Sequence, residues 1–96
     1  MNYTPDILRI EKAVKEVTGY DLEDMKINTR KVSLLYAKML FSHEARKEGL
    51  TYDQIGDCIS RHHSTVMYYE RIFDDELNVN NHFKTLYEMM RNVLKV

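Results

Sequence analysis

The sequence predicts an all-α domain of about five helices that contains a helix-turn-helix. Apolar residues recur at spacings of three and four along most of the chain, as they do on the buried face of a helix. Capping residues and glycines divide this pattern into separate helices, and no strand-like alternation is strong enough to compete. Because 96 residues can bury one modest core, we expect residues 1–96 to form a single domain.

The first predicted helix opens with three residues suited to a helix start. Thr4 supplies a capping hydroxyl, Pro5 fits the first helical position, and Asp6 places a carboxylate against the helix dipole. Gly19 ends the helix, and a short turn is expected over Asp21–Asp24. The apolar stripe is expected to be core: Ile7, Ile10, Val14 and Val17.

A second long helix is predicted over Asn28–Glu48, with Gly49 as its stop. Apolar residues line both of its sides, so we expect it to be central, with neighbours on each side: Val32, Leu35, Tyr36 and Met39 on one side, and Leu34, Ala37, Phe41 and Ala45 on the other. His43 is expected to be a partly buried spacer. Arg30 and Lys31 fall in the first turn, where cations oppose the helix dipole. Phosphate contact would explain them, and so would two solvated cations at small cost.

The helix-turn-helix is predicted within Thr51–Phe73. Thr51 and Gln54 have the spacing of a capping box, and Ile55 and Ile59 would lie on the buried side of the short helix that follows. Ser60 offers a second N-cap, before a helix that opens at Arg61. That helix is expected to turn one row inward, Val66, Tyr69 and Phe73, and another outward, Ser64, Met67, Tyr68 and Arg71.

The residues at the tip of this second helix have the chemistry of a DNA contact. Arg61 carries a fixed charge, and His62 and His63 are donors that can become cationic near neutral pH. Ser64 and Thr65 are short hydroxyls that can reach phosphates or base edges. The helix start also presents unpaired N–H groups and a positive dipole end. Such residues are common as ordinary caps as well, so the pattern alone leaves a structural interpretation open.

The run IGDCISRHHSTVM resembles the signature of the C-terminal DNA-binding domain (domain IV) of the bacterial replication initiator DnaA. The matching residues are Ile55, Gly56, Ile59, Arg61, His63, Ser64, Thr65 and Val66. A weaker similarity begins at Thr29, Arg30 and Lys31. The resemblance implies a stand-alone DnaA C-terminal-like domain of the Trp-repressor-like helix-turn-helix group.

The resemblance also implies a site and a partner. Double-stranded DNA is the expected partner, with the recognition helix in the major groove. We expect Arg30, Lys31, Thr51, Arg61 and Thr65 to contact the DNA backbone, and His62, His63 and Ser64 to contact base edges. The role would be replication initiation, its regulation or transcriptional control. A replication protein or a second copy of the chain are further partners that the sequence leaves open.

Three departures from the family pattern bear on the DNA it would prefer. His62 stands where the family commonly has Asp, a residue that can accept a hydrogen bond from cytosine. Tyr69 occupies an inward position where the family keeps a small residue. The family's Arg-rich loop, which reaches into the minor groove, is replaced by Asp24–Asn28 with a single Lys. The alternative is therefore a helical protein–protein interaction module that has lost DNA affinity.

The C-terminal quarter is predicted to form one more amphipathic helix. Asp74–Glu76 is expected to be a solvated break, and Asn78–Asn81 a loop that ends in an N-cap. The final helix would close the core with an apolar face: Phe83, Leu86, Tyr87, Met90, Val93 and Leu94.

Composition narrows the function classes. The net charge of −1 divides into about +3 over residues 26–72 and acidic flanks, so DNA binding should depend strongly on salt. No Gly-x-x-x-x-Gly-Lys-Ser/Thr run is present, and therefore no nucleotide is expected. The sequence offers no nucleophile–base pair and no metal-ligand set, so we expect neither an enzyme nor a cofactor. A single Cys58 and the lack of a membrane-length apolar run favour the cytoplasm.

Overall fold

The computed structural model describes residues 4–95, which fold into six helices without a strand. The helices are α1 (Pro5–Thr18), α2 (Leu22–Met25), α3 (Val32–Lys47), α4 (Tyr52–Ile59), α5 (His63–Val79) and α6 (Asn81–Leu94). The predicted all-α class is confirmed. The sequence predicted about five helices, and the additional one is α2, a single helical turn where a short turn was expected over Asp21–Asp24. The side chains of Asp21 and Asp24 each accept a hydrogen bond from the other residue's backbone N–H, which forms a capping box.

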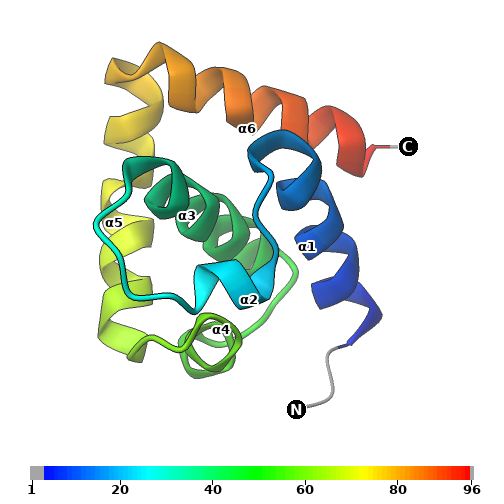
Figure 1. The fold of residues 1–96 in the computed structure, drawn as a ribbon, viewed down its shortest axis with the longest axis vertical. Coiled ribbons are helices and arrows are strands. Elements are labelled where there is room, and N and C mark those ends of the chain that lie inside the picture. The colour runs from blue at the N-terminus through cyan, green and yellow to red at the C-terminus, as the bar shows by residue number, and fades with distance from the viewer. Residues whose placement is uncertain (1–3, 96) are drawn as a thin grey trace.

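Helix α3 lies at the centre of the fold, as its two apolar sides predicted. In Figure 1 it is flanked by α1 on one side and α5 on the other, with α6 across the top and α2 and α4 below. Leu34, Ala37, Leu40 and Phe41 on α3 are buried. Helix α4 and the start of α5 lie together at one end of the molecule, away from α6.

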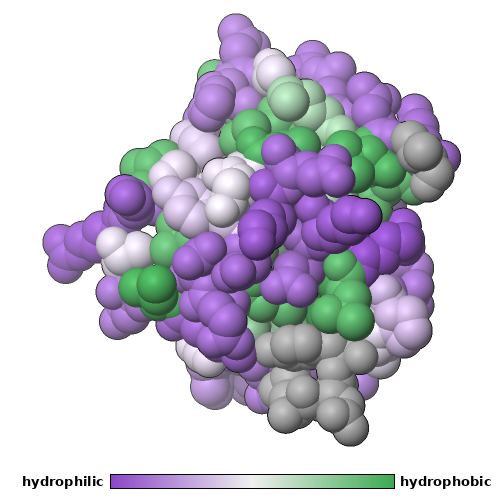
Figure 2. Space-filling view, turned by 45° about the vertical axis from the view of Figure 1, so that its right-hand side comes forward, coloured by the Kyte–Doolittle hydropathy of each residue, from purple (hydrophilic) through white to green (hydrophobic). Residues whose placement is uncertain are grey.

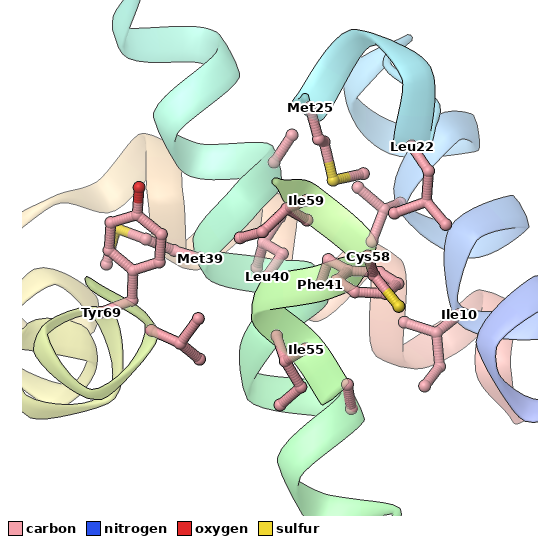
Figure 3. Close-up of a cluster of buried hydrophobic side chains, with 14 of the residues drawn as sticks. Ile10, Leu22, Met25, Met39, Leu40, Phe41, Ile55, Cys58, Ile59 and Tyr69 are labelled. Atoms are coloured by element: carbon pink, nitrogen blue, oxygen red, sulfur yellow. The ribbon is translucent and has the colours of Figure 1, made fainter. Parts of the chain in front are cut away.

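The core joins all six helices. Figure 3 shows Ile59 of α4 beside Leu40 of α3, Cys58 on the side of α4 that faces Ile10 of α1, and Ile55 on the side that faces Tyr69 of α5. The predicted stripe of α1 is buried at Ile7, Ile10 and Val14, and only partly at Val17. Polar side chains predominate on the face of α1 that Figure 2 turns toward the viewer. This helix therefore anchors one side of the core while its other face stays hydrated.

Two predicted boundaries are wrong. Helix α3 begins at Val32 rather than Asn28, and Val32 itself is 56% exposed rather than part of the apolar side. Asp74–Glu76 is not a break, because α5 continues through it to Val79. The acidic side chains of Asp74 and Asp75 face solvent while the buried side of the helix continues from Phe73.

The predicted loop before the last helix reduces to a single residue, Asn80, which ends α5 and caps α6. Its side-chain oxygen accepts a hydrogen bond from the Phe83 N–H at 3.1 Å, and its side-chain nitrogen donates to the Tyr36 hydroxyl on α3. An ion pair fixes the other part of α6, since the partly exposed Arg91 lies 2.9 Å from the carboxylate of the buried Glu44. Helix α6 is thus bound to α3 at both ends.

His43 on α3 is partly buried, as expected, and it does more than fill space. Its ring stacks on Phe73 of α5 at 3.8 Å, and its Nδ1 lies 2.9 Å from the Glu70 carboxylate. Tyr87 of α6 meets the same ring edge-on. The residue therefore links the central helix to the middle of α5, above the end of the molecule where α4 and the start of α5 lie in Figure 1.

Candidate nucleic-acid interface

Helix α4 starts with the predicted capping box. The Thr51 hydroxyl accepts a hydrogen bond from the Gln54 N–H at 3.1 Å, and the Gln54 side-chain oxygen accepts one from the Thr51 N–H at 2.8 Å. Two otherwise unpaired donors at the helix start are satisfied in this way. Thr51 as a residue is exposed to solvent.

The turn between α4 and α5 depends on the small size of Gly56. The Arg61 N–H donates to the Gly56 carbonyl at 2.9 Å, which brings the two backbones into contact. A Cβ at position 56 would lie 2.4 Å from the Arg61 carbonyl oxygen. The Ile-Gly pair of the motif therefore has a steric reason in this chain.

Ser60 is not the N-cap that the sequence predicted. It ends α4 in the left-handed region, with φ of 54°. The N-cap of α5 is His62, whose Nδ1 accepts a hydrogen bond from the Ser64 N–H at 3.2 Å and lies 2.8 Å from the Ser64 hydroxyl. Helix α5 consequently begins at His63, two residues later than predicted. Imidazole caps are less common than hydroxyl or carboxylate caps, which explains why the pattern pointed to Ser60.

His63 is exposed at the tip of α5 and has an acidic neighbour that the sequence did not reveal. Its Nδ1 lies 3.2 Å from the Asp53 carboxylate at the start of α4, and its ring centre lies 4.1 Å from that of His62. The side chain of His63 is 45% exposed and that of Asp53 is 83% exposed. Ten positions separate the two residues, so only the fold of the turn brings them together.

Arg61 is half-buried and connects the turn to the loop between α2 and α3. Its guanidinium donates hydrogen bonds to the backbone carbonyls of Lys26, Ile27 and Ser60, at 3.4, 2.9 and 2.9 Å. The Ile27 carbonyl also accepts a hydrogen bond from Lys38 at 3.3 Å. Arg61 and Lys38 thus both bind backbone carbonyls of the loop between α2 and α3.

Lys38 is a buried cation that the sequence analysis missed, because it interrupts the apolar face of α3 without a motif around it. The residue is only 3% exposed. Burial, and to a lesser extent the nearby Arg61 charge, lowers the pKa of Lys38 below 10.5. Its hydrogen bond to the Ile27 carbonyl partly offsets the cost of desolvating the charge.

Arg30 and Lys31 are both exposed, but they lie in the non-helical segment before α3 and not in its first turn. Lys31 occupies the N-cap position and makes no side-chain capping bond. The argument from an opposed helix dipole therefore does not apply to Arg30. Both residues follow directly on the segment that Arg61 holds, so they belong to the same end of the molecule as α4.

The outward row of α5 is confirmed. Ser64, Met67, Tyr68 and Arg71 are exposed, and the Arg71 guanidinium lies over the Tyr68 ring at 5.3 Å. The inward row is confirmed as well, since Val66, Tyr69 and Phe73 are buried. Thr65 lies between the two rows and is half-buried.

Tyr69 carries a polar group into the space beneath this interface. Burial raises the pKa of its hydroxyl, while Arg61 acts in the opposite direction through its charge and a hydrogen bond. Tyr69 thus fills the inward position where the family keeps a small residue, and its hydroxyl interacts with Arg61.

No group of three or more His, Cys, Asp or Glu suited to a metal ion is present in residues 4–95. Over the same range, no helix is both long and apolar enough to cross a membrane.

No curated protein and no solved structure gave a significant match. A family model described as the bacterial DnaA protein helix-turn-helix matches residues 7–72, which is well over half of the 96-residue chain and runs from α1 into α5. The chain belongs to the bacterial DnaA helix-turn-helix family.

Proposed function

We propose that this protein binds double-stranded DNA in a sequence-specific way, with the start of α5 in the major groove. Membership of the DnaA helix-turn-helix family indicates DNA binding. The observation that carries the finer proposal is the exposed tip of α5, where His62, His63 and Ser64 project next to a helix start and an outward row of polar and aromatic side chains. A helix-turn-helix reads bases with this part of its second helix.

This proposal assigns one group of residues to base edges and another group to phosphates. His62, His63 and Ser64 would contact base edges, since they stand at the helix tip. Thr51 at the start of α4, Arg30 and Lys31 after the loop, and Thr65 on α5 would contact phosphates, because hydroxyls and cations around a recognition helix fix its register on the duplex. Arg61 would assist chiefly by holding the loop that carries Arg30 and Lys31.

The biological role of this DNA binding is also part of the proposal. Binding of this kind would serve replication initiation, its regulation or transcriptional control in the cytoplasm. Without a phosphate-binding Gly-Lys-Ser/Thr run, the chain itself would not hydrolyse ATP.

A second candidate is a protein-interaction module that keeps the fold without DNA affinity. The observation in its favour is the acidic side chain of Asp53 beside His63, together with exposed Asp57 on the same helix. Carboxylates near a groove repel phosphates, so such a surface would suit a basic protein instead.

Selection from a random duplex pool, followed by salt titration on the retained sequences, tests the DNA proposal. A protein that contacts about five phosphates should give a log–log salt slope of about −4 to −5. His63→Ala should weaken binding to a selected duplex by about 1–3 kcal/mol and relax preference at one position. His82→Ala is the matched control, because His82 is exposed on α6, beyond the far end of α5. A protein that enriches no duplex above the random pool would refute DNA binding and favour the interaction module.

A further inference from the structure

Asp53 and His63 form a contact between the two helices of the helix-turn-helix. The Nδ1 atom of His63 lies 3.2 Å from the Asp53 carboxylate. Nε2, the other ring nitrogen, is the one left to meet a ligand. His62 stands on the other side of the His63 ring, at 4.1 Å between ring centres.

The Asp53 carboxylate distinguishes between the two neutral forms of the His63 ring. A neutral imidazole carries its proton on either Nδ1 or Nε2, and the bare nitrogen presents a lone pair. Nδ1 lies at ion-pair distance from a carboxylate oxygen, 3.2 Å, without the geometry of a hydrogen bond. The negative charge repels a lone pair on Nδ1 and attracts an N–H there, so the carboxylate favours the proton on Nδ1 and leaves Nε2 as an acceptor.

The choice of ring form decides which bases His63 can accept as partners. In the major groove, adenine and cytosine offer amino donors at N6 and N4, while guanine offers the acceptors O6 and N7, thymine offers O4, and adenine also offers N7. An Nε2 acceptor pairs only with an amino group, whereas an Nε2–H pairs with guanine, with thymine or with N7 of adenine. The ring form of the same side chain therefore changes which bases it can select.

We infer that Asp53 is a positioning residue that makes neutral His63 select a base with an exocyclic amino group, adenine or cytosine, at one position of the duplex. This inference rests on the proposed DNA binding. Asp53 would act through the imidazole and not by touching the base. Its effect on affinity is separate, since its charge repels phosphates like any other carboxylate on α4.

The free protein provides the first test. Long-range ¹H–¹⁵N spectra of the histidine rings report both charge and proton position, so they identify conditions under which His63 is neutral. The ratio of Nδ1–H to Nε2–H in the parent should exceed that in Asp53→Asn by about two- to fivefold, the range expected for an exposed ion pair. Asp57→Asn is the matched control, because it removes the same charge from an exposed position one turn further along α4. Equal ratios in the parent and Asp53→Asn would overturn the inference, whether or not DNA is bound.

The second test uses selection from a random duplex pool under the conditions in which His63 is neutral. The parent and Asp57→Asn should enrich adenine or cytosine at one position. Asp53→Asn should lose that preference or change it to guanine or thymine, and Asp53→Glu should restore it. Both Asn variants should gain similar affinity for random duplex, because each removes one negative charge. Duplexes in which purine replaces adenine, or 2-pyrimidinone replaces cytosine, tell which amino group is read.

The outcomes separate the two proposals. A parent that enriches no duplex removes the proposed function, and the base preference with it. A parent that enriches a sequence unchanged by Asp53→Asn keeps the proposed function and overturns the role of Asp53. In Asp53→Asn/His63→Ala the change of base should disappear, since the effect passes through His63. Circular dichroism spectra that match the parent confirm that each variant is folded.

Discussion

Substitution of Gly56 by Ala tests whether the turn holds the recognition helix in place. The added Cβ would lie 2.4 Å from the Arg61 carbonyl oxygen, far inside van der Waals contact, so α4 and the turn must separate. Overpacking of this kind costs about 1–3 kcal/mol, and weakening the hydrogen bond from Arg61 to Gly56 costs about 1 kcal/mol more. Ala gains up to about 1 kcal/mol over Gly through helix propensity. We therefore expect a net loss of about 2 kcal/mol in the free energy of unfolding.

Urea denaturation followed by circular dichroism measures this loss, and thermal denaturation should show a Tm lower by about 8–16 °C for a domain of this size. Asp57→Ala is the control, because the neighbouring residue is exposed and its replacement should change stability by less than about 0.5 kcal/mol. The sign of the change in the free energy of unfolding tests the steric explanation. If Gly56→Ala were as stable as the parent or more so, helix propensity would outweigh the contact, and the steric explanation of the Ile-Gly pair would be refuted.

Two further predictions concern the elements behind the interface. Asn80→Ala should lower the free energy of unfolding by about 1.5–3 kcal/mol in urea, since it removes the cap of α6 and the bond to Tyr36; the same loss in the exposed neighbour Asn81→Ala would contradict the capping role. Lys38→Met should change the pH dependence of stability. Because burial lowers the pKa of Lys38 in the folded state, the unfolded chain binds more protons, and the parent should gain stability relative to Lys38→Met as the pH rises through the alkaline range up to about 10.5. A stability difference that stays constant over this range, measured by urea denaturation, would show that Lys38 pays no burial cost.

The parts of the fold that follow local rules could be predicted from the sequence. The capping box at Thr51 and Gln54 and the inward row of α5 depend on neighbours within one or two turns, and the structure confirms both. The start of α3 and the N-cap of α5 could not be predicted. The sequence predicted that residues 28–31 are helical, but Arg61 and Lys38 bind the Ile27 carbonyl just before them, and these contacts come from distant positions.

The same reasoning explains what was missed at the site. Asp53 lies in the first turn of α4, where an acidic residue has an ordinary role against the helix dipole. Its contact with His63 arises only because the turn folds α5 back across α4. The run Asp74–Glu76 suggested a break because three acidic residues follow one another. The helix continues because the apolar residues on either side of the run, Phe73 and Leu77, lie at helical spacing and pack in the core.

Arg61 is the residue at which structure and DNA contact are hardest to separate. A guanidinium has five N–H donors, and three hydrogen bonds already go to backbone carbonyls of the loop and turn. Few donors are left for a phosphate, yet the charge itself stays at the interface and acts over about 8–10 Å at ordinary salt concentrations. Arg61 can therefore favour DNA in two ways, through its charge and through the position of Arg30 and Lys31. The loop contacts supply a structural reason for an Arg at this position, because a Lys ammonium could not reach three carbonyls with the same planar geometry.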